Sequence, residues 1–494
     1  MLRKVLVANR GEIAVRIVRA LREAGISSVA VYSDADRASL AVKMADEAVH
    51  IGPAPSSESY LRIDKIIDAA KRTGTDAVHP GYGFLSENAE FAEACAATGI
   101  IFIGPPASAI RMMGSKTSAR QVAIAAGAPV VPGTEEALRD PDRAREIAKK
   151  LGYPVLLKAA AGGGGKGMRR VDREQDLEAA LRDASSEALR AFRNDEVYVE
   201  KLVVEPRHIE IQVLGDQHGH MIHLGERECS IQRRHQKVIE ECPSPVMLAH
   251  PELREKMGEA ALKVARAAGY ANAGTMEFLV DRDRNFYFLE MNTRLQVEHP
   301  VTELATGIDL VQWQLRIAAG EKLTLQQSDI TWTGSAIECR VYAEDPANQF
   351  LPSPGKITYL EQPSGPGIRL DSGVYQGWTV PLDYDPMLAK LAVWAPTREL
   401  AIERSRRALR EYIVAGIRTN VAWFDQILDH LDFRSGALST AFLDRFEAKP
   451  RESDPEAEAV AALVAAITSA KPERPQEVRK SSAWRDAGRA EMMR

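Results

Sequence analysis

The segments Gly274-Thr-Met-Glu-Phe-Leu-Val-Asp281 and Asn285-Phe-Tyr-Phe-Leu-Glu-Met-Asn292 lie on either side of a short charged stretch. Their apolar and β-favouring residues predict two strands, and the charged residues between them predict a turn. A two-residue loop at Asp283-Arg284 would place Glu277 directly opposite Glu290 on one face of the hairpin. This predicted pair of carboxylates is the most informative feature of the chain.

Like charges that face each other across two strands destabilise a sheet, and a divalent cation between them reverses the effect. Asn292 shares the same face two residues further on. Oxygen ligands from two carboxylates and an amide suit Mg²⁺ or Mn²⁺ that bridges nucleotide phosphates. The hairpin therefore predicts a metal site formed by Glu277, Glu290 and Asn292. A solvated strand face on which two glutamates tolerate each other is the alternative.

Polar residues continue at every second position beyond the hairpin, at Asn292, Arg294, Gln296 and Glu298, with largely apolar residues between them. This alternation predicts a polar face that extends from the metal ligands. Phosphoryl transfer to an oxyanion requires cations that hold charge and a base that removes a proton. Arg294 and Glu298 are of these types, although a solvated edge would show a similar pattern.

A glycine-rich loop follows a predicted strand at 153–158 and covers Ala161-Gly-Gly-Gly-Gly-Lys-Gly167. Such a loop lets backbone amides approach an anion closely. It is not a Walker A motif, because Gly167 follows Lys166 where serine or threonine is needed. It is a weak dinucleotide fingerprint, because Met168-Arg-Arg-Val171 predicts a returning strand and not a helix. We predict a mobile phosphate lid, with a flexible hairpin tip as the alternative.

Outside this region the sequence predicts two further domains. Residues 1–115 alternate between strand and helix patterns, which is typical of a parallel sheet with helices on both faces. Residues 334–446 open with a strand at Ala336–Val341 and contain helices at 397–413 and 419–431. The composition changes after Pro450, which indicates a tail.

The bulk composition excludes several classes of protein. The 494 residues suffice for about three domains, and 45% hydrophobic with 27% charged residues is typical of a soluble globular chain. A net charge of −5 gives no indication of nucleic-acid binding. The first apolar run is too short for a signal peptide or a membrane span. The four cysteines are scattered and include no CxxC pair, so neither a zinc site nor disulfides are predicted. A cytoplasmic location is therefore expected.

The motifs together resemble those of the biotin carboxylases, a family of the ATP-grasp superfamily, over about residues 1–446. They are the glycine loop, Ala8–Ala14, His79–Asn88, Glu226–Lys237, Glu290–Pro300 and Phe350–Gly355. The resemblance implies an α/β chain with an ATP-grasp fold in three domains. These are a Rossmann-like N-terminal domain at 1–115, an ATP-grasp domain at 116–330 with its lid at about 131–203, and a C-terminal biotin carboxylase domain at 334–446.

The resemblance also implies roles for single residues. Those that would bind ATP are Lys116, Lys158, Gly164, Gly165, Glu200, Lys201, Val203, His208, Gln232, His235, Glu277 and Glu290. The metal ligands would again be Glu277, Glu290 and Asn292. Bicarbonate would be held by Lys237, Arg294, Gln296, Val297 and Arg340, and biotin by Tyr82 and Arg340. Glu298 would be the general base, and Lys237, Arg294 and Arg340 would complete the catalytic group.

The implied reaction is the carboxylation of biotin by ATP and bicarbonate, the first half-reaction of an acetyl-CoA or other acyl-CoA carboxylase. The biotin carrier and the carboxyltransferase are expected on separate chains. Ala41-Val-Lys-Met44 only approximates a biotin-bearing turn and lies inside the first predicted domain. The family suggests a homodimer. Neither nucleic acid nor a membrane is an expected partner.

Other interpretations stay open at this point. They are the biotin carboxylase subunit of a two-subunit pyruvate carboxylase, another ATP-grasp ligase, and a nucleotide-binding regulatory subunit without activity. In the tail at 447–494, Val460, Leu463, Val464 and Ile467 form an apolar stripe. This stripe predicts a docking segment for a partner protein, and a frayed extension is the alternative.

Overall fold

The computed structural model describes residues 2–134, 138, 140–159, 168–192 and 196–449, with short pieces of the tail at 459–460, 462–466 and 491–492. The contacts divide the chain into residues 1–447 and 448–494, and each unit is described by itself. The glycine loop at 161–167, which includes Gly164 and Gly165, lies outside the described residues.

The N-terminal region is built on a five-stranded parallel sheet in the order β3-β2-β1-β4-β5. Its strands are β1 (Lys4–Val7), β2 (Ser27–Ser33), β3 (Glu47–Gly52), β4 (Ala77–His79) and β5 (Ile101–Phe102). Its helices are α1 (Gly11–Glu23), α2 (Leu40–Met44), α3 (Ile63–Thr73), α4 (Ala89–Ala97) and α5 (Ala107–Gly114). The predicted parallel α/β arrangement is thus confirmed. Ala41–Met44 lies in α2, so it is not the turn of a biotin carrier.

The central sheet has eight strands in the order β13-β12-β9-β10-β11-β14-β21-β19. Its strands are β9 (Arg207–Gly215), β10 (Met221–Arg233), β11 (Gln236–Cys242), β12 (Asn272–Val280), β13 (Phe286–Asn292), β14 (Ser335–Tyr342), β19 (Ile368–Ser372) and β21 (Met387–Ala395). The pairing of β11 with β14, which sets Ile239 against Cys339, joins the central and C-terminal regions in one sheet.

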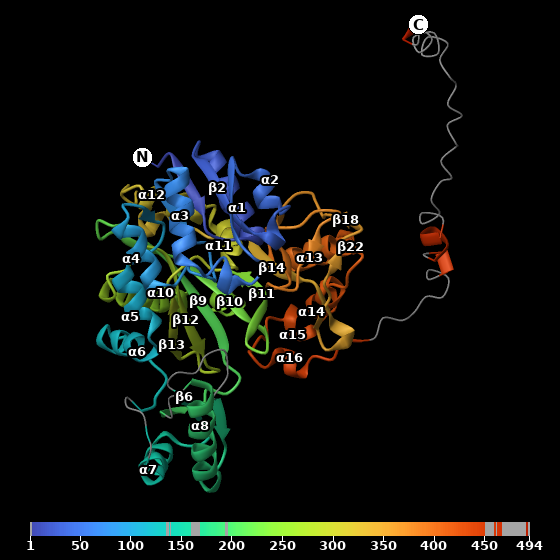
Figure 1. Cartoon of the computed structure of the whole chain (residues 1–494). Helices are drawn as coiled ribbons and strands as arrows, with labels where there is room; N and C mark the ends of the chain where they lie inside the picture. Colours follow the sequence, from blue (N-terminus) through green and yellow to red (C-terminus); the bar gives the residue numbers. More distant parts are fainter. Residues whose placement is uncertain are drawn as a thin grey trace. The chain divides into compact units, whose positions relative to one another are not determined.

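Helices of the central region lie beside this sheet (Figure 1). They are α6 (Lys116–Ala125), α9 (Pro245–Ala249), α10 (Pro251–Ala267), α11 (His299–Thr306) and α12 (Leu310–Ala318). The lid is a separate small sheet in the order β7-β6-β8 with its own apolar core. It comprises α7 (Pro141–Leu151), β6 (Val155–Ala159), β7 (Met168–Val171), α8 (Leu177–Phe192) and β8 (Val197–Lys201). The predicted return of the chain at Met168–Val171 is confirmed, because β7 pairs antiparallel with β6.

The C-terminal region adds helices and short strands around β14, β19 and β21. The helices are α13 (Arg398–Glu411), α14 (Val421–Asp429), α15 (Leu431–Arg434) and α16 (Phe442–Arg445). The short strands are β15 (Glu344–Asp345), β16 (Leu351–Pro352), β17 (Gly355–Lys356), β18 (Tyr359–Glu361), β20 (Thr379–Val380) and β22 (Ile413–Ala415). The strand and the two helices that the sequence predicts here are confirmed by β14, α13 and α14.

The hairpin of β12 and β13 confirms the predicted pairing and corrects the predicted turn. Glu277 lies opposite Glu290, but the last paired residues are Val280 and Phe286. The backbone amide of Asp281 donates to the carbonyl of Asn285 at 2.9 Å, so the loop has three residues and not two. A bulge between the Glu277 and Phe278 pairs shifts the register by one residue and restores the carboxylate pair.

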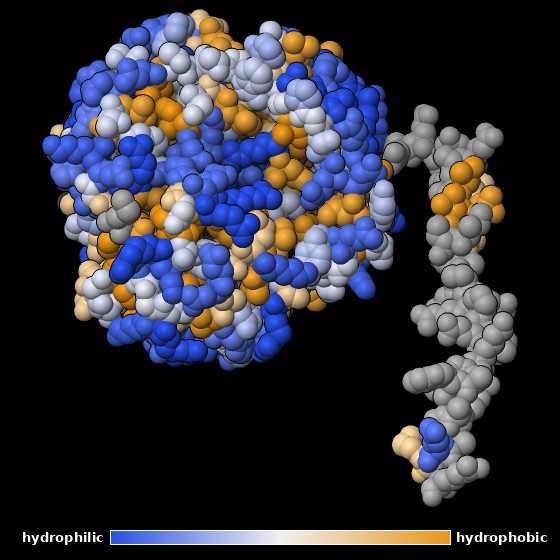
Figure 2. Space-filling view, turned by 90° about the horizontal axis from the view of Figure 1, so that it is seen from above, coloured by the Kyte–Doolittle hydropathy of each residue, from blue (hydrophilic) through white to orange (hydrophobic). Residues whose placement is uncertain are grey.

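The tail unit is helical at 459–460 and 462–466, where Val460, Leu463 and Val464 are exposed. Hydrophobic residues of this unit form an orange group on the tail in Figure 2, apart from the orange patches of the large unit. Ile467 and most of the predicted docking segment lie outside the described residues. No helix in the described part of the chain combines the length and hydrophobicity that crossing a lipid bilayer requires.

A close backbone approach joins the first and last regions of the large unit. A Cβ added to Gly373, just after β19, would lie 2.7 Å from the backbone nitrogen of Glu12 and 2.7 Å from the carbonyl carbon of Gly11. We expect Gly373→Ala to lower the free energy of unfolding by about 1–3 kcal/mol, because backbone atoms cannot move aside as a side chain can. Calorimetric unfolding measures the change. The control is Gly114→Ala in α5, which meets nothing within 4 Å; equal destabilisation by both variants contradicts the prediction.

Candidate active site

Residues of the lid, of the central sheet and of α6 line a cavity of about 1190 Å³. Most of the residues predicted for ATP, metal and bicarbonate lie in its wall. They are Lys116, Lys158, Glu200, Val203, His208, Gln232, His235, Lys237, Glu277, Glu290, Asn292, Arg294, Gln296, Val297, Glu298 and Arg340. The fold thus brings together residues that are up to 224 positions apart in the sequence, from Lys116 to Arg340.

Among the residues that the structure describes, two predicted site residues do not lie in this wall. The side chain of Lys201 follows Glu200 on β8 and points to the other face, where its Nζ donates to the carbonyl of Gly152 at 2.7 Å. Tyr82 is not among the residues of the cavity wall, and its hydroxyl is buried without a hydrogen-bond partner in the described part of the chain. The roles of Lys201 and Tyr82 therefore stay predictions.

The paired carboxylates of β12 and β13 differ in their electrostatic surroundings. Burial, and then the neighbouring Glu277, raise the pKa of Glu290. Burial also raises the pKa of Glu277, but Lys237 and His208 outweigh this effect and hold it well below its ordinary value. Asn292 donates from Nδ2 to Glu277 Oε1 at 2.7 Å. Two adjacent carboxylates and one amide form a donor set that fits a hard divalent cation.

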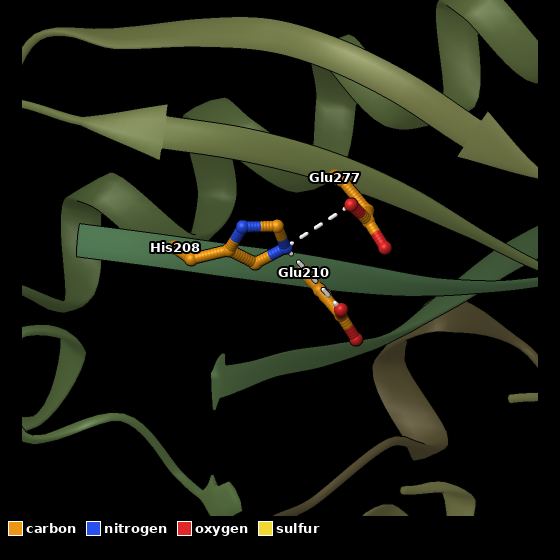
Figure 3. A group of neighbouring side chains, drawn as sticks. All are labelled: His208, Glu210 and Glu277. Atoms are coloured by element: carbon orange, nitrogen blue, oxygen red, sulfur yellow. Dashed lines mark ion pairs between the residues drawn. The ribbon is translucent and has the colours of Figure 1, made fainter. Parts of the chain in front are cut away.

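His208, Glu210 and Glu277 project toward one another from β9 and β12 (Figure 3). His208 Nε2 lies 3.1 Å from Glu277 and 3.4 Å from Glu210. Burial lowers the pKa of His208, but the two carboxylates raise it to about 9. The imidazole is therefore a cation at neutral pH. The side chains also lie close enough together to be a ligand set for a metal ion, which shares Glu277 with the predicted set, although His208 would first have to lose this proton.

Lys237 of β11 is the cation that contacts the buried carboxylates of the site. Its Nζ donates to Glu277 at 2.8 Å and to Glu298 at 3.0 Å, and it also contacts Glu210. Burial lowers the pKa of Lys237, but the three carboxylates raise it well above its ordinary value. The ammonium group therefore stays charged across the physiological pH range.

The segment after β13 carries the predicted base but is not a strand. β13 ends at Asn292, and the chain passes through a bend and a turn before α11 begins at His299. The polar side chains nevertheless face the cavity. Arg294 donates from Nε to Glu87 at 2.9 Å and from Nη2 to Asn292 at 2.9 Å. The predicted common polar face is confirmed by the cavity wall, although the segment that carries it is not a strand.

Glu298 lies between two cations. Its Oε1 accepts from Lys237, and its Oε2 accepts from Nη2 of Arg340 at 2.8 Å. Burial and Glu210 raise the pKa of Glu298, but Lys237 and Arg340 lower it further, to below its ordinary value. Arg340 is held from behind by Glu240, which accepts from its Nε at 2.6 Å. Glu298 is thus ionised at neutral pH and able to accept a proton.

Several charged residues in or behind the site were not predicted, among them Glu87, Glu210, Arg227 and Glu240. Arg227 is fully buried and donates to Glu210 at 3.1 Å and to Gln296 at 2.6 Å. A signal for Glu210 was present, because His208, Glu210 and Gln212 alternate with Ile209, Ile211 and Val213. This alternation predicts a second polar face beside the paired carboxylates. Glu87 and Glu240 contact Arg294 and Arg340. Glu87 lies within the motif His79–Asn88, whereas no local pattern marks Glu240.

Three family descriptions match consecutive parts of the chain. The biotin carboxylase N-terminal domain matches residues 1–110, and the biotin carboxylase C-terminal domain matches residues 338–445. Between them, the ATP binding domain of the carbamoyl-phosphate synthase L chain matches residues 115–326.

Individual proteins are similar over nearly the same length. A pyruvate carboxylase subunit from Methanothermobacter thermautotrophicus is 53% identical, over 90% of each chain. "Biotin carboxylase 1" of Bacillus subtilis is 51% identical, over 90% of this chain and 99% of that protein. The dimeric biotin carboxylase domain of the Hydrogenobacter thermophilus 2-oxoglutarate carboxylase, solved with MgADP, ADP and bicarbonate, has a TM-score of 0.84 at 47% identity. It matches 91% of this chain and 100% of that one. The chain therefore belongs to the biotin carboxylase family, a family of ATP-grasp ligases.

Proposed function

We propose that this chain carboxylates biotin on a separate carrier protein with ATP and bicarbonate, as the first half-reaction of an acetyl-CoA or other acyl-CoA carboxylase. The observation that supports the proposal most is the position of Glu298. This ionised carboxylate is held between Lys237 at 3.0 Å and Arg340 at 2.8 Å, next to the paired carboxylates of β12 and β13. A base, two fixed cations and a metal-binding pair are what proton removal and phosphoryl transfer need.

ATP would occupy the part of the cavity between the lid and the central sheet. Its phosphates would meet Lys116 and Lys158, and the nucleoside would meet Glu200, Val203, Gln232 and His235, all of which line the cavity. Lys158 now forms an ion pair with Glu200 at 2.5 Å, which nucleotide binding would replace. Glu277, Glu290 and Asn292 would hold Mg²⁺ or Mn²⁺, which neutralises phosphate charge when bound.

In the first step Glu298 removes the proton from bicarbonate. The resulting carbonate oxygen attacks the γ-phosphorus of ATP, the bond to the β-phosphate oxygen breaks, and carboxyphosphate and ADP result. Lys237 and Arg294 stay charged and hold the negative charge that gathers on the reacting oxygens. Gln296 and Val297 line the same part of the wall and orient bicarbonate.

In the second step carboxyphosphate splits into CO₂ and phosphate. The phosphate takes the proton from the ureido nitrogen of biotin, and the nitrogen then attacks CO₂. Arg340 stabilises the enolate oxygen of biotin, and its guanidinium is already oriented by Glu240 on one side and Glu298 on the other. Tyr82 would be a further contact for biotin.

The carrier and the carboxyltransferase would be separate chains, and the chain itself would form a homodimer. The dimeric state of the related Hydrogenobacter domain supports this arrangement.

A role in a pyruvate carboxylase is the second candidate, because one relative of 53% identity carries that name. The acceptor is identified by carboxylation assays of the reconstituted holoenzyme with acetyl-CoA, propionyl-CoA and pyruvate in turn. Truncation after Ala448 tests docking by the tail, and intact assembly would exclude it.

Glu298→Gln should lower kcat for bicarbonate-dependent ATP hydrolysis by about 10²–10⁴-fold, because the amide cannot accept the proton of bicarbonate. Arg340→Ala should impair carboxylation of free biotin more than ATP hydrolysis, because it removes the group that stabilises the enolate. Both rates are measured with and without bicarbonate. Glu259→Gln, which affects an exposed pair with Lys263, serves as the control. Equal loss of both activities in Arg340→Ala contradicts the assignment to biotin.

Glu277→Gln and Glu290→Gln should each raise the Mg²⁺ concentration that ATP binding requires by at least about tenfold, because each removes one carboxylate ligand. Isothermal calorimetry of ATP binding at several Mg²⁺ concentrations measures the change. Glu259→Gln again serves as the control. An unchanged Mg²⁺ requirement in both variants would show that the metal is bound elsewhere.

A further inference from the structure

A completely buried lysine lies behind the segment that carries Glu298. Lys390 of β21 has no exposed surface, and its Nζ donates to the backbone carbonyl of Val297 at 2.9 Å. Its charge is balanced by Glu12 of α1 at 3.2 Å and by Asp371 of β19 at 3.9 Å. The ammonium also lies 5.8 Å from the ring centroid of Tyr82. A buried ammonium requires such partners, so its position is well determined.

The neighbouring carbonyl of the same turn has a second buried donor. His299 is fully buried, and its Nδ1 lies 2.8 Å from the carbonyl oxygen of Gln296. Burial, helped by Lys390 and Arg369, holds the pKa of His299 well below its ordinary value. The ring is therefore neutral, and its single proton lies on Nδ1, because a carbonyl oxygen only accepts. Two consecutive carbonyls, of Gln296 and Val297, are thus directed into the protein.

The direction of a carbonyl determines the direction of the amide in the same peptide. In a trans peptide the N–H points opposite to the C=O. The hydrogen bond from Lys390 to Val297 therefore turns the amide of Glu298 away from Lys390, and the hydrogen bond from His299 turns the amide of Val297 away from the ring. Val297 and Glu298 both line the cavity. Lys390 lies outside the wall and influences the site only through this turn.

We propose that Lys390 is a positioning residue for the bicarbonate site: through the carbonyl of Val297 it fixes the turn that presents Gln296, Val297 and Glu298 to the substrate. The inference rests on the proposed function. The competing explanation is that Lys390 only ties the N-terminal and C-terminal regions together through Glu12 and Asp371. The two explanations differ in their effect on bicarbonate and on ATP, because the lysines and β8 residues expected to bind ATP belong to α6, β6 and β8 and not to this turn.

The test compares Lys390→Met with Glu12→Gln in the full-length chain. Lys390→Met removes the hydrogen bond to Val297, whereas Glu12→Gln removes only a charge partner of the ammonium. We expect Lys390→Met to raise the KM for bicarbonate about tenfold, as loss of one charge-assisted hydrogen bond does, and to leave the KM for MgATP nearly unchanged. Hydrogen exchange of the amides at 295–299 should become faster in Lys390→Met. Glu12→Gln should leave both KM values nearly unchanged.

Each outcome bears on one of the two hypotheses. An unchanged KM for bicarbonate in folded Lys390→Met overturns the positioning role, as does an equal rise in Glu12→Gln. If Lys390→Met does not fold, the double variant Lys390→Met/Glu12→Gln, which removes the unpaired carboxylate as well, is measured in its place. If that variant also fails to fold, the lysine is a determinant of the fold and the proposal is rejected. Absence of bicarbonate-dependent ATP hydrolysis in the wild-type chain is a separate failure, that of the proposed function.

Discussion

The site depends on one ammonium group among three buried carboxylates. Lys237 holds Glu210, Glu277 and Glu298 at hydrogen-bonding distance, although these residues come from β9, β12 and the turn before α11. Without a cation between them, mutual repulsion and the loss of hydration would drive such groups apart or neutralise them. The lysine therefore permits negative charge to be concentrated in the very place where a metal ion and a base are needed.

A second layer of charge supports the first from within the sheet. Arg227 has no exposed surface and binds Glu210, Gln212, Thr275, Gln296 and Thr302. These contacts satisfy buried polar atoms, and leaving such an atom without a partner would cost about 1–3 kcal/mol. Arg340 with Glu240, and Lys390 with Glu12, repeat the arrangement further along the sheet. Side chains of the cavity wall are thus hydrogen-bonded by residues that lie behind them.

The sequence was sufficient for the parallel N-terminal sheet, the hairpin pair and most of the cavity wall, because these follow from periodicity and from motifs. It was insufficient for the turn of the hairpin, where a longer loop and a bulge shift the register in opposite directions and cancel each other. The pairing of Glu277 with Glu290 was predicted with the wrong turn, and a bulge that no residue pattern announces restored it. β3 has a weak sequence pattern, because it is a half-exposed edge strand in which only Val49 and Ile51 are buried. The contacts of Glu87 with Arg294 and of Glu240 with Arg340 depend on tertiary packing, so no local pattern predicts these pairs.

The continuous central sheet has a consequence for dividing the chain. Because β11 and β14 are hydrogen-bonded neighbours, a cut near residue 334 would leave a row of unpaired backbone groups and buried apolar side chains on both fragments. Such exposed strands bind one another or other chains, so separately expressed halves would be prone to aggregation. The same continuity makes Arg340 sensitive to alignment, because a slip of β14 by one residue would turn it to the opposite face of the sheet. Fusion proteins and split reporters built on this chain are better opened in surface loops outside that sheet.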